Sequence, residues 1–137
     1  MEPYIHRVHY YETDKMSCVH HANHIHWMEE ARVAYLESLG IGFDKLEARG
    51  IYSPVVGIEC RYRRPAYFNE EIRVTVRITS FEGLRLKVGY EMVRISDGVL
   101  IATGSSEHCF TNTEGRVIAL KNTHPDVDAV LRAAITP

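Results

Sequence analysis

The sequence of 137 residues contains no long apolar run. No stretch approaches the roughly 18 consecutive apolar residues of a membrane-spanning helix. The first residues, Met1-Glu2-Pro3-Tyr4, lack the basic and then apolar segment of a secretory signal. These two absences predict a cytoplasmic protein without a membrane span.

Cysteine and net charge are also scarce. The three cysteines, Cys18, Cys60 and Cys109, are odd in number and far apart, and no Cys-x-x-Cys pair is present, which argues against a zinc or redox centre. With 16 basic and 18 acidic side chains, the net charge of -2 gives no field that would attract nucleic acid. We therefore expect reduced, structural thiols and no nucleic-acid partner.

Repeats, low-complexity tracts and linker-like stretches rich in proline, glycine or serine are absent as well. A hydrophobic content of 45% with 25% charged residues is typical of a globular chain. At this length the chain is expected to form a single domain, which spans residues 1–137.

A clear helical period is present from about Asn23 to Leu39, and Gly40 ends it. The apolar side chains that share one face of this helix are Trp27, Met28, Ala31, Ala34, Tyr35 and Leu39. Ile25 and Leu36 widen this face, which suits a central helix partly wrapped by a curved sheet.

Alternation of apolar and polar residues predicts the strands. The five expected strands cover residues 4–11, 55–62, 72–79, 84–91 and 99–110, and a terminal helix begins at Pro125. Two consecutive hairpins make the sheet antiparallel. The predicted fold class is therefore α+β, a five-stranded antiparallel sheet wrapped around a central helix. Because one helix cannot cover both faces of the sheet, we expect a second subunit on the outer face and near the small residues around Gly104.

Five motifs follow one another along the chain. They are ETD at 12–14, HHAN at 20–23, WMEEAR at 27–32, YRRPA at 62–66 and TNTEGR at 111–116. In this order and spacing the chain resembles the 4-hydroxybenzoyl-CoA thioesterase family, whose members are hot-dog fold acyl-CoA thioesterases. The resemblance implies a hot-dog fold and hydrolysis of an acyl-CoA thioester to the free acid and CoA without a cofactor. It also implies a homodimer or a homotetramer of two dimers, with sites at subunit interfaces.

The resemblance further implies two catalytic groups. Asp14 matches the family's catalytic carboxylate, and the backbone N–H of His21 matches the group that polarises the thioester carbonyl. An N–H at a helix start lacks an intrahelical acceptor and lies in a positive dipole, so it suits a developing oxyanion. Asp14 can act as a nucleophile or as a general base. The chain departs from the family pattern at Ser17, where glycine is common, and at His24, where tyrosine is common.

Other residues admit a functional and a plain structural interpretation. Arg61, Arg63 and Arg64 suit the phosphates of coenzyme A, because a guanidinium donates paired hydrogen bonds, and they equally suit a solvated strand edge. His20 and His24 stand at the i, i+4 spacing of metal ligands, but a third ligand and a separate base are lacking. We therefore predict no metal. Without the surrounding motifs, Asp14 would read as a helix cap or a solvated loop carboxylate.

Two other functions compete with hydrolysis. A hot-dog 3-hydroxyacyl thioester dehydratase needs a histidine and a carboxylate, which His20 or His21 with Asp14 would imitate. A non-catalytic acyl-CoA binding module needs only the pocket. Release of free thiol from acyl-CoA separates hydrolysis from both alternatives.

Overall fold

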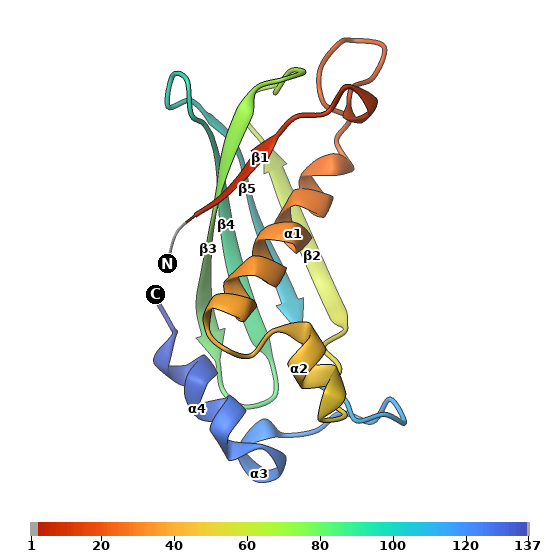
Figure 1. The fold of residues 1–137 in the computed structure, drawn as a ribbon, viewed down its shortest axis with the longest axis vertical. Helices are drawn as coiled ribbons and strands as arrows, with labels where there is room; N and C mark the ends of the chain where they lie inside the picture. Colours follow the sequence, from red (N-terminus) through yellow and green to blue (C-terminus); the bar gives the residue numbers. More distant parts are fainter. Residues whose placement is uncertain (1–2, 137) are drawn as a thin grey trace.

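The computed structural model describes residues 3–136 and contains one five-stranded antiparallel sheet, in the order β1-β3-β4-β5-β2 (Figure 1). The strands are β1 (Tyr4–Arg7), β2 (Val55–Tyr62), β3 (Glu71–Phe81), β4 (Leu86–Arg94) and β5 (Leu100–His108). The helices are α1 (Asn23–Ser38), α2 (Phe43–Ala48), α3 (Leu120–Thr123) and α4 (Pro125–Ala133), and a 3₁₀ helix covers Tyr10–Glu12. The long helix α1 lies along the concave side of the sheet, which confirms the predicted α+β class and central helix. None of the helices within residues 3–136 is long and apolar enough to cross a membrane.

The predicted first strand over residues 4–11 is wrong in its second half. β1 ends at Arg7, and the 3₁₀ helix follows because the side chain of Glu12 accepts the His9 N–H at 2.7 Å. The Glu12 N–H in turn donates to the His9 carbonyl at 3.0 Å, so the chain turns here instead of continuing the ladder. β2 has the predicted bounds, whereas α2 and α3 lie in segments for which no helix was predicted.

Helix α1 packs against the sheet through the predicted apolar face. Trp27, Met28 and Ala31 are fully buried. Gly104 on β5 permits this close approach, because a Cβ at that position would lie 2.8 Å from the Met28 sulfur. The small residue therefore faces α1 of its own chain, and this close approach accounts for a glycine here without a second subunit.

The outer face of the sheet is polar. Its exposed or half-exposed side chains include Arg73, Thr75, Lys87, Glu91, Thr103, Ser105 and Glu107. This composition suits water, so the outer face does not require the subunit cover that the number of helices suggested.

A chain of polar side chains is buried between α1 and the sheet. Arg32 Nη1 donates to the Tyr90 hydroxyl at 3.0 Å, the Tyr90 and Ser106 hydroxyls are 2.6 Å apart, and Ser106 Oγ is 2.7 Å from His108 Nε2. Because arginine only donates hydrogen bonds, the Tyr90 hydroxyl accepts from Arg32 and donates to Ser106 Oγ. The Ser106 hydroxyl then donates to His108 Nε2. This order places the proton of a neutral His108 on Nδ1, which is buried without a partner in the described chain.

This burial makes the stability of the protein depend on pH. Burial, and then the positive charge of Arg32, lower the pKa of His108 to about 4 from 6.5. The unfolded chain therefore binds a proton between these two pH values that the folded chain does not, and stability falls as the pH drops through this window.

We expect His108→Gln to flatten the pH dependence of stability. Between pH 7 and pH 5 the wild type should lose about 2 kcal/mol more than the variant, since one pKa unit corresponds to about 1.4 kcal/mol. Urea unfolding at both pH values measures this difference. His26→Gln, at an exposed histidine of α1, is the matched control and should behave as the wild type. Equal pH slopes for wild type and His108→Gln would contradict the prediction.

Candidate functional site

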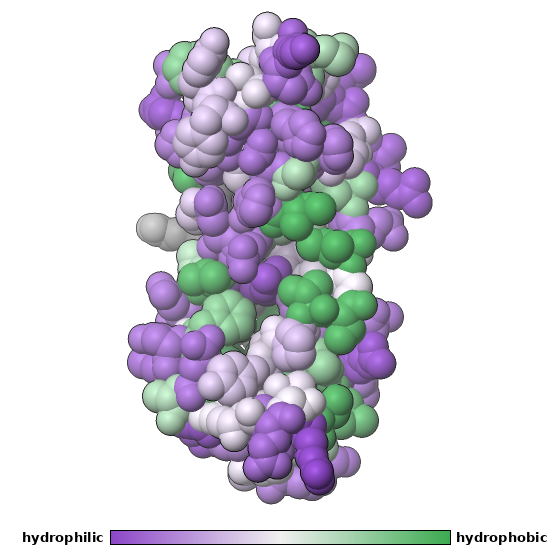
Figure 2. All heavy atoms as spheres, turned by 90° about the vertical axis from the view of Figure 1, so that its right-hand side faces the viewer, coloured by the Kyte–Doolittle hydropathy of each residue, from purple (hydrophilic) through white to green (hydrophobic). Residues whose placement is uncertain are grey.

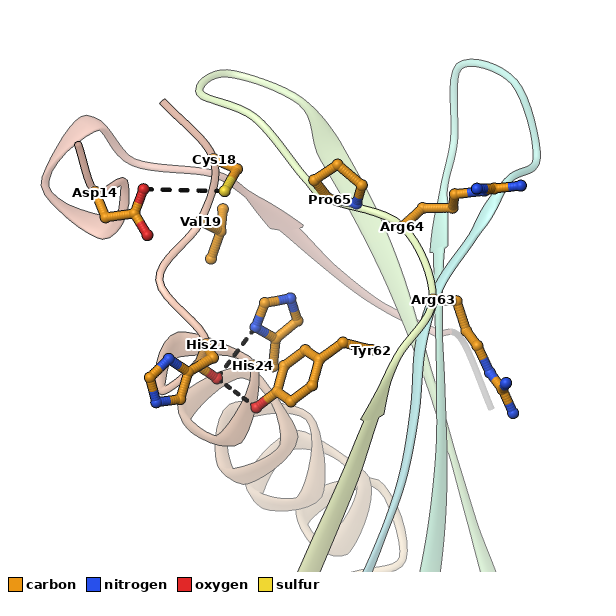
Figure 3. Close-up of a pocket in the computed structure, with 9 residues that line it drawn as sticks. All are labelled: Asp14, Cys18, Val19, His21, His24, Tyr62, Arg63, Arg64 and Pro65. Atoms are coloured by element: carbon orange, nitrogen blue, oxygen red, sulfur yellow. Dashed lines mark hydrogen bonds between the residues drawn. The ribbon is translucent and has the colours of Figure 1, made fainter. Parts of the chain in front are cut away.

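A hollow of about 350 Å³ lies where the start of α1 meets the end of β2. Its lining residues are Asp14, Cys18, Val19, His21, His24, Tyr62, Arg63, Arg64 and Pro65 (Figure 3). Both residues of the predicted catalytic pair, Asp14 and His21, are among them. We call this space the Asp14 hollow.

Asp14 lies in a tight turn of the loop before α1. Its N–H donates to the Cys18 carbonyl at 2.9 Å, and its carbonyl accepts the Ser17 N–H at 3.0 Å. One carboxylate oxygen, Oδ1, accepts the Met16 N–H at 2.8 Å, and the Cys18 thiol is 3.9 Å from the same atom. Ser17 adopts a φ of 68°, in the left-handed region that favours glycine. This positive φ explains why glycine is common at the position of Ser17 in the 4-hydroxybenzoyl-CoA thioesterase family, which the chain resembles.

The backbone carbonyl of His21 is hydrogen-bonded, whereas its N–H is not. The carbonyl accepts the Tyr62 hydroxyl at 2.7 Å and lies 3.3 Å from His24 Nδ1 (Figure 3). Burial, followed by the neighbouring Cys60 thiol, raises the pKa of Tyr62 to about 12, so the hydroxyl keeps its proton and donates. The His21 N–H, in contrast, has no acceptor within residues 3–136. An unused N–H just before a helix, on a residue whose carbonyl is held in place, is suited to bind an anionic oxygen.

Glu12 anchors both halves of this site. Its buried carboxylate accepts hydrogen bonds from His6 Nε2 at 2.8 Å, the Trp27 indole at 2.7 Å and the His9 N–H at 2.7 Å. Burial alone raises the pKa of Glu12, but these donors outweigh it and hold the pKa below 4.5. The carboxylate therefore stays ionised and joins β1, the 3₁₀ helix and α1.

The backbone of Glu12 holds the returning loop. Its carbonyl accepts the His20 N–H at 2.8 Å and the Asn23 side-chain amide at 2.9 Å. Asp14 follows Glu12 by two residues, and His21 follows His20, so one residue fixes the chain on both sides of the hollow. Glu12 belongs to the ETD motif, but nothing in the sequence indicates its role as an anchor.

The three predicted arginines are not brought together. Arg63 and Arg64 line the hollow with their backbone side, and their side chains point away from Asp14 and His21 (Figure 3). Arg61 does not line the hollow. Its Nε lies 3.2 Å from Oε1 of Glu59 on the same strand. This exposed pairing with Glu59 agrees with the structural interpretation of Arg61, a solvated residue at a strand edge.

The i, i+4 pair His20 and His24 is not part of the cluster of possible metal ligands in the described residues. Within residues 3–136, the side chains that could hold a metal ion together are His6, His9 and Glu12. Their potential ligand atoms all lie within 4.8 Å of one another. His20 and His24 do not take part; the buried His24 ring packs against Trp27, with ring centroids 4.9 Å apart. Burial lowers the pKa of His24, so this ring is neutral at pH 7.

The chain was compared with known proteins. Residues 8–135 match the family model described as the thioesterase-like superfamily. "Putative acyl-CoA thioesterase YneP" of Bacillus subtilis (strain 168) is 33% identical over 119 residues, which are 87% of this chain and 86% of that protein.

Solved structures agree with this match. The DHNA-CoA thioesterase from Staphylococcus aureus has a TM-score of 0.91 at 28% identity, covering 96% of this chain and 89% of that chain. A hypothetical protein from Thermus thermophilus has a TM-score of 0.85 at 32% identity, covering 98% of this chain and 97% of that one. The fold and the family assignment therefore rest on nearly the whole chain.

We expect Glu12→Gln to destabilise the protein by about 1 to 3 kcal/mol, because the amide group turns a donor toward a buried donor. Glu30→Gln is the matched control. Glu30 also lies beside His6, at 3.3 Å, but is exposed, and its loss should cost less than about 0.5 kcal/mol. Urea unfolding at pH 7 measures both variants.

The pH gives a second check on Glu12. Its folded pKa lies below 4.5, so its contribution is present above that pH and is lost as the pH falls through the folded value. The difference in the free energy of unfolding between wild type and Glu12→Gln should therefore become smaller as the pH falls below 4.5. A small loss of stability in Glu12→Gln at pH 7, or equal losses in Glu12→Gln and Glu30→Gln, would show that Glu12 does not anchor the site.

Proposed function

The chain belongs to the thioesterase-like superfamily, and from this premise we propose that it is an acyl-CoA thioesterase whose chemistry takes place in the Asp14 hollow. The observation that carries the proposal is the unused His21 N–H at the start of α1, in the same hollow as the Asp14 carboxylate. The resemblance to the 4-hydroxybenzoyl-CoA thioesterase family and the names of the relatives support it. In this proposal the chain forms one domain, residues 1–137, which supplies both the Asp14 carboxylate and the His21 N–H of a site.

In the proposed reaction the thioester carbonyl oxygen accepts the His21 N–H, which stabilises the negative charge that develops there. Asp14 then acts in one of two ways. Its carboxylate attacks the carbonyl carbon, the C–S bond breaks, and water hydrolyses the resulting anhydride. Alternatively, it takes a proton from a water molecule that attacks the same carbon. Both routes release the free acid and the CoA thiol.

Coenzyme A binding is proposed for the arginines at the end of β2. Arg63 and Arg64 flank the hollow, and their exposed side chains are free to meet nucleotide phosphates outside it. Arg61 would first have to leave Glu59, so it is the weakest of the three candidates. No metal or redox cofactor enters the proposed reaction.

We also propose that the active form is a homodimer joined through β2. This strand is the last in the sheet order and carries exposed apolar side chains, Val55, Val56 and Ile58. Figure 2 shows apolar side chains running along the face of the molecule that carries β2. An apolar edge strand of this kind invites pairing with another strand.

Two-fold pairing of β2 with its copy would be antiparallel. The start of one β2, at Val55, then lies beside the end of the other, at Tyr62. Residues 52–55 of the second copy would thus extend the wall of the Asp14 hollow. A tetramer of two such dimers is compatible with the polar outer face of the sheet.

We expect Asp14→Asn to reduce thioester hydrolysis by about 10²- to 10⁴-fold, because the amide keeps the size but is neither base nor nucleophile. Thiol release from acyl-CoA measures this loss, with circular dichroism as the check on folding. Asp44→Asn, at an exposed aspartate on α2, is the control and should keep wild-type turnover. Near-normal turnover in Asp14→Asn would refute the site. Substrate loss without thiol release would favour a dehydratase.

We expect Ile58→Glu to weaken the dimer at least tenfold, because a charge would be buried at the paired edge. Light scattering after gel filtration at micromolar concentration gives the mass. Leu84→Glu is the matched control, since Leu84 is similarly exposed (46% against 43% for Ile58) but lies in the β3–β4 turn. Dissociation by both variants, or by neither, would rule out β2 as the interface.

A further inference from the structure

Arg32 is a buried cation without a counter-charge. Its side chain is 6% exposed, and its Nη1 donates to the neutral Tyr90 hydroxyl. None of the Asp and Glu oxygens described lies within 4.0 Å of its guanidinium, and its Nε has no hydrogen-bond partner there. A buried charge without a partner is strongly unfavourable, so a purely structural role does not explain an arginine at this position.

The polar neighbours of Arg32 do not supply the missing negative charge. Tyr90 and Ser106 are hydroxyls, and His108 is neutral at pH 7 or positive at acid pH. The Nδ1 of His108 is a second buried nitrogen without a partner. Nothing that packs against the guanidinium on the sheet side is therefore anionic.

Arg32 is also among the residues that line an open hollow of about 530 Å³ between α1, α2, residues 52–55 and Thr111. We call it the Arg32 hollow. Its lining is mixed, and the apolar part of the wall is formed by Val33, Phe43, Pro54 and Val55. Glu29 and Glu47 also line it, but both are exposed, so water screens their charges.

We propose that the Arg32 hollow binds a carboxylate on an apolar body, with the carboxylate on the Arg32 guanidinium and the apolar part against Val33, Phe43 and Pro54. A guanidinium fits a carboxylate with two parallel hydrogen bonds, and a buried guanidinium such as that of Arg32 attracts an anion more strongly than one in water does. The size of the hollow is in the range of small-molecule sites.

Two sources share this chemistry. One is a free fatty acid. The other, which rests on the proposed thioesterase function, is the distal end of an acyl group whose thioester lies at His21. His21 and Arg32 are eleven residues apart along α1, or about 16 Å at 1.5 Å per residue. An acyl chain of roughly twelve carbons with a terminal carboxylate would span that distance within one chain.

The first experiment needs no enzymatic activity. Isothermal titration of the full chain with octanoate, and with octanol as the uncharged control, measures binding to wild type and to Arg32→Met. We expect octanoate to bind at least tenfold more weakly to Arg32→Met, with an unfolding midpoint equal to or above that of the wild type. An unchanged affinity for octanoate, a much lower midpoint, or dissociation of the dimer would overturn the proposal and make Arg32 a structural or interface residue.

Val33→Glu keeps the test valid if Arg32→Met does not fold. It leaves Arg32 in place but puts a carboxylate into the apolar part of the wall, at a half-buried position where water screens it less than it screens Glu29 and Glu47, so octanoate should again bind at least tenfold more weakly. Ile95→Glu, at an exposed residue outside the hollow, is its control and should bind as the wild type. Equal binding by Val33→Glu and Ile95→Glu would refute the site.

The second experiment separates the two sources. The ratio of kcat/KM for dodecanedioyl-CoA to that for dodecanoyl-CoA should fall at least tenfold in Arg32→Met if the acyl group is the ligand. An unchanged ratio with weakened octanoate binding identifies a free acid. Failure to hydrolyse either thioester would refute the proposed function alone, because octanoate binding still decides the fate of the Arg32 hollow.

Discussion

The buried carboxylate of Glu12 is the constraint on which the arrangement of the site depends. A carboxylate leaves water only at a high cost in free energy unless donors replace the lost hydration. His6, His9 and Trp27 supply those donors from three separate elements. Each element is therefore held against the others, and the loop with Asp14 begins from a fixed point. The position of the reactive carboxylate is decided by a neighbour that has no part in the proposed chemistry.

Helix α1 connects the features that matter for function. Its start carries the unused N–H of His21, its middle packs Met28 onto Gly104, and its next turn buries Arg32. Since a helix is stiff over this length, the two hollows are held at a nearly constant separation. The close contact at Gly104 prevents α1 from moving toward the sheet. A ligand that spans both hollows would meet a preformed distance and not one that it has to create.

Periodicity was sufficient to predict α1, β3 and the antiparallel sheet, because their apolar positions repeat with the geometry of the element. It failed where a side chain competes with the backbone: Glu12 turns the chain that would have prolonged β1. Periodicity also gave no sign of Arg32 and His24, since polar residues on a buried face do not follow hydropathy. Asp14 and His21 were identified from a family motif. The hydrogen bond from Tyr62 that fixes His21 joins residues 41 positions apart and leaves no local pattern.

The left-handed backbone at Ser17 has a further consequence for how the loop is maintained. A residue with a Cβ adopts this conformation at a cost of about 1 kcal/mol, and it does so only where the surroundings impose it. Short peptides of this sequence should therefore not form the turn around Asp14 by themselves. Mutations that loosen distant packing would then silence the site before they unfold the protein.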